Sequence, residues 1–154
     1  GLGNYCDFWM HNGLMEDSEG KLSKSRGERI TLKEVFKDCP PPALRFYLLG
    51  FHYRDFTPYS AEGLLEACQE GERLGVNAVD CMVVEPTDPR EDEETAPLVT
   101  KFEDALSDDL DTPRTLDVLR ELDEIAGNRL KNKGDIGPIS GMYSIFQCVL
   151  GVFS

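Results

Sequence analysis

Residues 60–84 read SAEGLLEACQEGERLGVNAVDCMVV, and their apolar side chains recur at intervals of three and four residues. That spacing places them on one face of an α-helix: Leu64, Leu65, Cys68, Leu74, Ala78, Val79 and Met82. Ser60 is a residue type favoured at a helix N-cap. Gly71 and Gly75 weaken the helix without ending it. The pattern therefore predicts one long amphipathic helix.

Two helices are predicted before this one. Thr31 and Glu34 have the spacing of a capping box, which favours a helix start at this point. The three consecutive prolines at 40–42 end that helix and begin another. We expect the second helix to be buried and to run to about Tyr53.

Further helices are predicted after residue 84. Residues 97–106 form one, Thr112 and Pro113 begin the next, and residues 139–153 form the last after a turn at 134–138. The predicted fold class is mainly α: a short N-terminal strand and loop, a small helical module, and then an antiparallel helical bundle.

The N-terminal residues are rich in aromatic side chains. Residues 5–15 read YCDFWMHNGLM and contain the turn-prone pair Asn12-Gly13, so they predict a strand leading into a turn. A strand needs partners, and we expect these partners upstream of Gly1. The first residue is Gly rather than Met, which favours a fragment boundary over a natural start.

Composition limits the class of protein. The chain has 154 residues, 40% of them apolar, and a formal net charge of −13. This size suits one domain or two small ones. No stretch approaches the roughly 20 apolar residues of a membrane helix, so no membrane contact is expected. The five cysteines lack the two-residue spacing of metal and redox motifs, which predicts reduced thiols in a cytoplasmic protein and no metal site.

The acidic balance argues against a broad nucleic-acid-binding face. Cationic residues concentrate in 21–29, KLSKSRGER, so phosphate binding is expected near the N-terminal end. Lys21 and Lys24 lie three apart in a loop flanked by glycines, and Ser23 and Ser25 can donate hydrogen bonds to phosphate oxygens. Such cations stabilise the pyrophosphate that leaves when an adenylate is transferred to a carboxylate. Taken alone, these residues could equally form a solvated loop without function.

The surroundings of this loop carry a family resemblance. The string at 21–25, KLSKS, resembles the second signature of class I aminoacyl-tRNA synthetases, which usually has Met where Leu22 stands. Other matches cover nearly the whole chain in the same order: 8–13 (FWMHNG), 31–35 (TLKEV), 44–49 (LRFYLL), 52–54 (HYR), 59–62 (YSAE), 102–106 (FEDAL) and 108–113 (DDLDTP). On these residues the chain resembles the cysteinyl-tRNA synthetases.

The resemblance implies a cysteine–tRNA ligase that converts ATP to AMP and pyrophosphate, present here as a partial chain that is inactive alone. It implies catalytic roles for Lys24 and Lys21. It implies contacts of the loop and its neighbourhood with ATP through Lys21, Ser23, Lys24, Ser25 and His11. It also implies tRNA-facing roles for Lys33, Arg45 and Arg54. From its own position, beside Tyr53 in the predicted apolar helix, His52 is expected to be a packed or hydrogen-bonded core residue.

The resemblance also implies partners and parts. The partners are tRNA(Cys), ATP with Mg, and cysteine, and the full enzyme is expected to be a cytoplasmic monomer. Zinc is expected only in an upstream part of the family fold, because its ligands are not in this sequence. Residues 1–30 would end the nucleotide-binding domain, 31–84 form a helical stem-contact module, 85–95 an acidic linker, and 96–154 a helical bundle.

Two alternatives stay open. Arg26 stands where Leu is more usual in the synthetases, and Asp111 stands where Asn is common. An Arg at the first position is also seen in the related ligase that joins cysteine to an amino-sugar in mycothiol synthesis, although the matches at 52–54 and at the Asp-Thr-Pro string 111–113 favour the synthetase. The second alternative is a non-catalytic tRNA-docking helical module, against which both lysines of the loop are intact.

Overall fold

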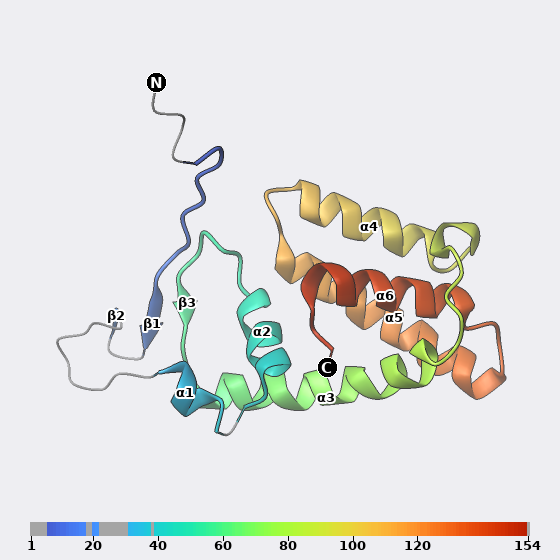
Figure 1. Cartoon of the computed structure of the whole chain (residues 1–154), viewed down its shortest axis with the longest axis horizontal. Coiled ribbons are helices and arrows are strands. Elements are labelled where there is room, and N and C mark those ends of the chain that lie inside the picture. The colour runs from blue at the N-terminus through green and yellow to red at the C-terminus, as the bar shows by residue number, and fades with distance from the viewer. Residues whose placement is uncertain (1–5, 18–19, 22–30, 38, 154) are drawn as a thin grey trace.

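The computed structural model describes residues 6–17, 20–21, 31–37 and 39–153. It confirms a mainly α fold with a small sheet at one end (Figure 1). The strands are β1 (Met15–Asp17), β2 (Gly20–Lys21) and β3 (Thr57–Pro58), in the order β2-β1-β3. β1 pairs with β2 antiparallel and with β3 parallel.

The strand predicted over residues 5–15 is wrong in its extent, because the described residues 6–14 are irregular and β1 begins only at Met15. Phe8 is 89% exposed and Met10 is 56% exposed. A strand is stable when neighbouring strands satisfy its backbone groups. Among the described residues 6–14, backbone hydrogen bonds to another segment join Gly13 to Tyr53 and Leu14 to Thr57.

The two short helices follow their predicted starts. α1 (Leu32–Val35) has the capping box, in which the Thr31 hydroxyl accepts from the Glu34 amide while the Glu34 carboxylate accepts from the Thr31 amide. α2 (Pro41–Leu49) begins directly after Pro40. It ends at Leu49 rather than near Tyr53, because the chain turns at Gly50 and then follows β1.

The long predicted helix is α3 (Ala61–Met82), and the Ser60 hydroxyl caps it by accepting from the Gly63 amide. After a 3-10 turn, η2 (Pro89–Glu91), come α4 (Ala96–Ser107), α5 (Thr112–Asn132) and α6 (Gly137–Leu150). The N-cap of α5 is Asp111 rather than Thr112, because the carboxylate of Asp111 accepts from the Arg114 amide.

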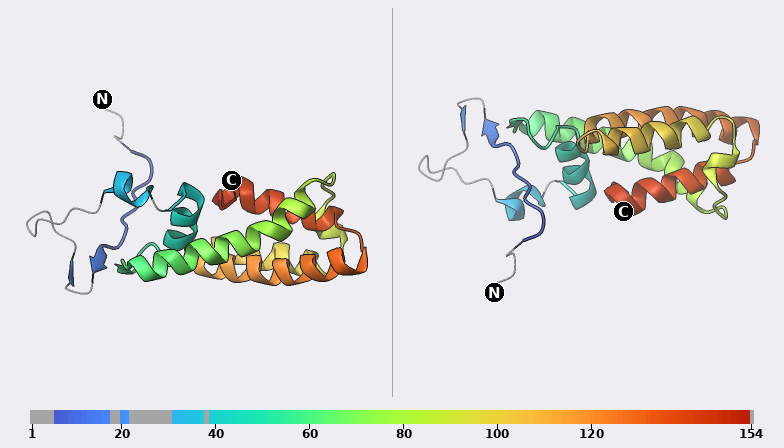
Figure 2. Two further views of the ribbon diagram at one scale, coloured as in Figure 1. Left: turned by 90° about the horizontal axis from the view of Figure 1, so that it is seen from below. Right: turned by 90° about the horizontal axis from the view of Figure 1, so that it is seen from above.

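The helices α3 to α6 lie side by side, and the colour gradient along them reverses from each helix to the next (Figures 1 and 2). Their facing apolar residues form one buried core. Fully buried members include Leu74, Cys81, Leu116, Leu119, Leu122, Ile139, Met142, Tyr143 and Phe146. The small sheet and α1 lie beyond one end of this helical part (Figure 2).

The acidic segment 85–95 is packed onto the helices. Arg129 of α5 donates to both carboxylate oxygens of Asp92, at 2.8 and 2.9 Å, and to Glu94 at 2.6 Å. The hydrogen bonds from Arg129 lower the pKa of Asp92 below its usual value. The helix that precedes this segment in the sequence, α3, packs against α5 and α6, which follow it.

All five cysteines lie in the described ranges and are free thiols, as the sequence predicts. Cys68 of α3 donates a hydrogen bond to Cys39, with 3.3 Å between the sulfur atoms. Burial raises the pKa of the Cys39 thiol to about 11. No helix in the described part of the chain has the length and apolar character needed to cross a membrane.

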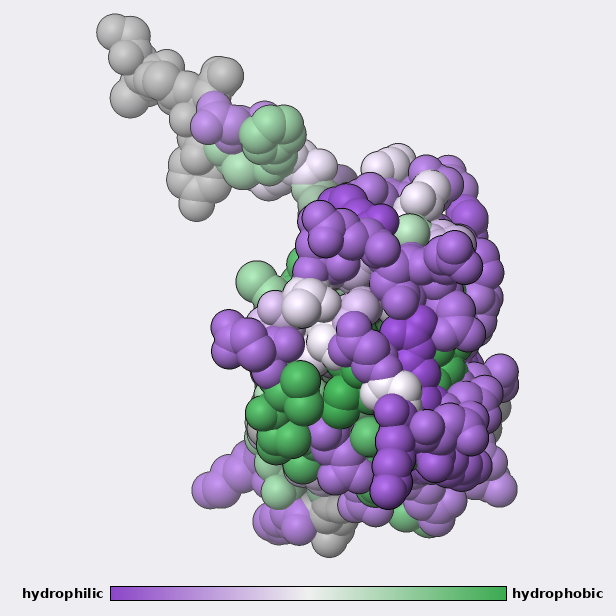
Figure 3. All heavy atoms as spheres, turned by 90° about the vertical axis from the view of Figure 1, so that its right-hand side faces the viewer, coloured by the Kyte–Doolittle hydropathy of each residue, from purple (hydrophilic) through white to green (hydrophobic). Residues whose placement is uncertain are grey.

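On the face seen in Figure 3, hydrophilic side chains predominate and apolar side chains gather in its lower part. Exposed apolar side chains gather toward the end of α3, namely Val76, Val79, Met82 and Val83. The buried apolar side chains of the long helices form the core.

Gly141 of α6 lies in close contact with the backbone of the 85–95 segment. A Cβ atom at this position would lie 2.2 Å from the carbonyl oxygen of Thr87. We expect Gly141→Ala to lower the free energy of unfolding by about 1–3 kcal/mol through overpacking. Denaturant unfolding of the two proteins measures this difference.

Gly75 is the matched control, because a Cβ there meets nothing within 4 Å. Gly75→Ala should stabilise the chain by up to about 1 kcal/mol through helix propensity. Equal effects of the two substitutions on the free energy of unfolding would contradict overpacking at Gly141.

Candidate functional site

The predicted phosphate loop follows the β1–β2 hairpin. Lys21 is the last residue of β2, and its backbone pairs with Glu16 of β1. Ser23, Lys24 and Ser25 lie outside the described residues, as does the side chain of Lys21. The described hairpin therefore fixes where the loop begins.

The hairpin is held by the connector between α2 and α3, which we define as residues 50–59. The Gly13 amide donates to the Tyr53 carbonyl at 2.6 Å. The Thr57 amide donates to the Leu14 carbonyl at 3.0 Å, and the Tyr59 amide donates to the Glu16 carbonyl at 2.6 Å. A Cβ at Gly13 would lie 1.8 Å from the Asp55 carbonyl oxygen, so this approach requires glycine.

The connector is fixed in turn by α2. The hydroxyl of Tyr47, a buried residue of α2, donates to the Pro58 carbonyl at 2.5 Å. The same hydroxyl accepts from the Ser60 amide at 3.3 Å. One side chain of α2 thus ties β3 to the start of α3.

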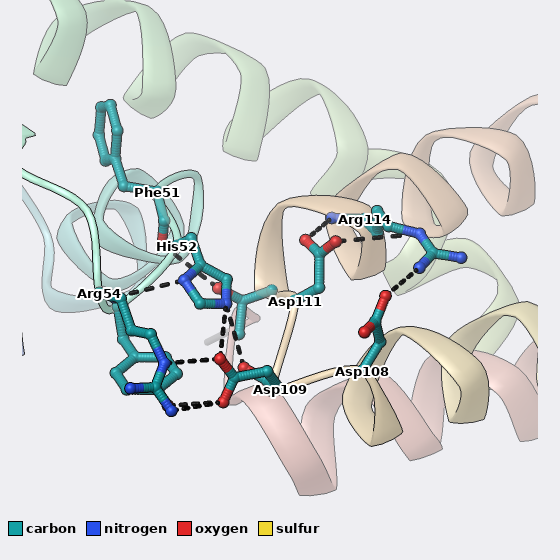
Figure 4. Close-up of polar contacts among 9 residues, drawn as sticks. Phe51, His52, Arg54, Asp108, Asp109, Asp111 and Arg114 are labelled. Atoms are coloured by element: carbon teal, nitrogen blue, oxygen red, sulfur yellow. Dashed lines mark hydrogen bonds and ion pairs between the residues drawn. The ribbon is translucent and has the colours of Figure 1, made fainter.

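A second set of contacts joins the connector to the turn between α4 and α5 (Figure 4). Asp109 in that turn accepts a two-point ion pair from Arg54, with Nε to Oδ2 at 2.6 Å and Nη2 to Oδ1 at 3.0 Å. The Tyr53 hydroxyl also donates to Asp109 Oδ1 at 2.7 Å. This fork geometry is the strong form of a guanidinium–carboxylate pair.

His52 adds a third contact to the same turn. Its Nε2 lies 3.1 Å from the Asp109 carbonyl oxygen, while its Nδ1 accepts from the Arg54 amide at 3.3 Å. These partners fit the tautomer that carries the proton on Nε2. His52 is hydrogen-bonded as predicted, but it lies in the connector after α2 rather than in a helix, and it is half-buried rather than in the core.

The α4–α5 turn has a special backbone. Asp109 has φ 56° and Leu110 has φ 58°, both in the left-handed region that non-glycine residues adopt with strain. Arg114 pairs with Asp108 at 3.2 Å, and the Thr112 hydroxyl donates to the Phe51 carbonyl at 3.5 Å (Figure 4). Each of these contacts stabilises the turn facing the connector.

The ion pair sets the titration of Asp109. The hydrogen bonds from Arg54 and Tyr53 lower the pKa of Asp109 from 3.8 to about 2. A folded-state pKa below the unfolded value means that the pair stabilises the fold fully above the unfolded pKa, and this stabilisation is lost as pH falls from about 4 to about 2.

We expect carbon-detected NMR titration to give an Asp109 pKa near 2. In Arg54→Met the pKa should return toward 3.8, because the dominant hydrogen bonds are removed. Asp108 is the internal reference, because it pairs with Arg114 instead. An Asp109 pKa that does not move in Arg54→Met would contradict the two-point pairing in solution.

The other predicted site residues lie apart from this cluster. Lys33 is exposed on α1, and His11 is exposed in the irregular segment before β1. Arg45 of α2 donates from Nη1 to the Gly151 carbonyl at 2.9 Å, at the C-terminal end of α6. Among the described residues, no hydrogen bond or ion pair joins His11, Lys33, Arg45 and Arg54 to one another.

The contribution of Asp109 was missed from the sequence. Both strings that form the cluster, 52–54 and 108–113, were singled out as family matches, but nothing paired them. The available signal was the opposite charge of the two strings, since 108–113 is acidic and 52–54 contains an arginine.

Comparisons with known proteins agree on one family. The model of the class I (C) tRNA synthetase catalytic domain matches residues 2–69. The cysteine–tRNA ligase of Pelobacter propionicus is 28% identical over 98% of this chain and 36% of its own length. That of Shewanella denitrificans is 35% identical over 97% of this chain and 32% of its own length. This chain thus spans about a third of the length of these relatives.

Proposed function

We propose, from the premise that this chain belongs to the cysteinyl-tRNA synthetase family, that it is part of a cysteine–tRNA ligase. In that enzyme it supplies the ATP-phosphate loop and helices that face tRNA. The observation that carries the proposal is the match to cysteine–tRNA ligases over 97% of the chain, including the loop that follows β2.

The loop acts on the leaving group of adenylation. The cysteine carboxylate attacks the α-phosphorus of ATP, and the bond to pyrophosphate breaks, so negative charge grows on the departing oxygens. In this proposal Lys24 places its ammonium against those oxygens, and Lys21 assists it. Ser23 and Ser25 donate hydrogen bonds to phosphate, and His11 approaches the nucleotide from the segment before β1.

The helices that face tRNA contribute cations at Lys33, Arg45 and Arg54. Lys33 is exposed on α1 and needs no rearrangement to meet a phosphate. Asp109 holds Nε and Nη2 of Arg54 but not Nη1, which leaves that nitrogen for a phosphate. Nη1 of Arg45 already donates to Gly151, so phosphate binding would compete with that bond.

The proposed reaction involves two metals, magnesium and zinc. Mg accompanies ATP in the proposal, and zinc belongs only to an upstream part of the family fold. The described residues contain no group of three or more His, Cys, Asp and Glu side chains that could hold a metal.

The partners of the complete enzyme are tRNA(Cys), ATP and cysteine, and we place it in the cytoplasm as a monomer. Family membership and the relatives' names support the three substrates.

Cysteine-dependent ATP–pyrophosphate exchange tests the proposal. The full-length gene product should catalyse exchange with cysteine, and the 154-residue chain alone should not, because it carries only part of the family's length. Serine in place of cysteine is the matched substrate control. Absence of cysteine-dependent exchange in the full-length product would refute the ligase assignment, and exchange by the short chain would refute its dependence on other parts.

A further inference from the structure

Two sets of contacts meet on the connector, residues 50–59. On one side, the amides of Gly13, Thr57 and Tyr59 form the hydrogen bonds between the connector and the β1–β2 hairpin. On the other side, Arg54, Tyr53 and His52 all contact Asp109 in the α4–α5 turn. The connector therefore lies between the start of the predicted loop and the helical bundle.

Asp109 concentrates the bundle side of this arrangement in one residue. Its carboxylate accepts three hydrogen bonds, two from Arg54 and one from Tyr53, and its carbonyl contacts His52. Arg54 also stacks on Tyr53, with the guanidinium carbon 5.0 Å from the ring centroid. Three consecutive connector side chains thus converge on a single turn residue (Figure 4).

The backbone of the turn is strained where it presents Asp109. Left-handed φ angles at both Asp109 and Leu110 are unfavourable for residues with a Cβ, and more so for a bulky residue such as Leu. Strain of this kind persists where surrounding contacts over-determine the conformation. The turn is held by the Leu110 and Asp111 amides, which donate to the carbonyls of Leu106 and Ala105.

We propose that Asp109 is a positioning residue that fixes the connector on the α4–α5 turn and thereby sets the position of the β1–β2 hairpin leading into the lysine loop. Its consequence for catalysis rests on the proposed function, whereas the mechanical link does not. A movement of the α4–α5 turn would then be transmitted through the connector to the β1–β2 hairpin, which ends at Lys21.

This role differs from a general contribution to stability. Both side chains of the ion pair are largely exposed, at 62% for Arg54 and 49% for Asp109. Exposed pairs contribute little to global stability. Loss of Asp109 should therefore loosen the hairpin and connector while the buried core of α5 and α6 keeps its protection.

Hydrogen exchange of the 154-residue chain tests the link. In Asp109→Ala, the amides of Gly13, Thr57 and Tyr59 should exchange roughly fivefold faster or more. Core amides of α5, such as Leu119, should keep their rate, and the melting temperature should fall only slightly, because the lost ion pair is exposed. Asp108→Ala is the matched control, because Asp108 is an adjacent acid that pairs with Arg114 and not with the connector.

Two further variants separate contacts from strain. Asp109→Asn keeps a side chain tolerated at left-handed φ and an acceptor for Tyr53, so it should restore part of the protection. Leu110→Gly relieves strain but keeps every contact of Asp109, so it should leave the three amides as slow as in the wild type. Faster exchange in Leu110→Gly equal to that in Asp109→Ala would overturn the role of the carboxylate.

Two outcomes would overturn the proposal directly: unchanged exchange at the three amides in Asp109→Ala, or an equal acceleration at Leu119. In the full-length enzyme, Asp109→Ala should raise the KM for ATP severalfold in pyrophosphate exchange, and Asp108→Ala should not. If the full-length protein shows no cysteine-dependent exchange but the three amides respond, the proposed function fails and the positioning role of Asp109 stands.

Discussion

Replacing Lys24 with alanine in the full-length protein is expected to lower the rate of cysteine-dependent ATP–pyrophosphate exchange on the order of 100- to 1,000-fold. The side chain would neutralise charge that appears on pyrophosphate only as the bond to the α-phosphorus breaks. A contact that is stronger in the transition state than in the ground state affects kcat more than the KM for ATP. Steady-state exchange at varied ATP measures both constants.

Lys131→Ala is the control for loss of one positive charge, since Lys131 is exposed near the end of α5. It should leave exchange unchanged. If Lys24→Ala also leaves exchange unchanged, the assignment of the lysine loop to ATP is wrong. The non-catalytic tRNA-docking module that the sequence leaves open would then be the better description of this chain.

Replacing Phe146 with alanine is expected to lower the free energy of unfolding by about 3–5 kcal/mol. Phe146 of α6 is fully buried, and its ring packs edge-on against Phe102 of α4 with 4.8 Å between centroids. Truncation leaves a cavity between two helices that cannot close without moving their backbones. Domains of this size are stable by about 5–15 kcal/mol, so the loss is a large share of the total.

Urea unfolding followed by circular dichroism measures this effect, with Val149→Ala as the control on the same helix. Val149 is 53% exposed, so its truncation should change stability by less than about 0.5 kcal/mol. Similar losses for both variants would contradict the packing of α6 on α4.

Local chemistry explains which parts of the fold the sequence predicted. Thr31 with Glu34 and Ser60 each begin a helix where a side chain can satisfy free backbone amides, and both caps formed as expected. The long helix through Gly71 and Gly75 also follows from its apolar periodicity. Patterns within four residues of each other are read directly from a sequence.

The errors arose where distant residues decide the structure. Residues 6–14 have strand-like composition, but strand formation depends on a neighbouring backbone. The pairing of Arg54 with Asp109 joins residues 55 positions apart. The arginine that holds the acidic segment, Arg129, lies 37 positions from Asp92. Patterns among neighbouring residues do not indicate partners at such distances along the chain.

The clamp of Arg129 on Asp92 and Glu94 has a consequence for dissecting the chain. Residues 85–95 are rich in proline and acidic residues, so this segment could be chosen as the boundary of a shorter expressed polypeptide. A polypeptide starting after it would lose α3, whose buried residues Leu74, Ala78 and Cys81 complete the core, and it would leave Arg129 without its carboxylates. The apolar faces of α5 and α6 would then meet water, and such a piece would aggregate rather than fold by itself.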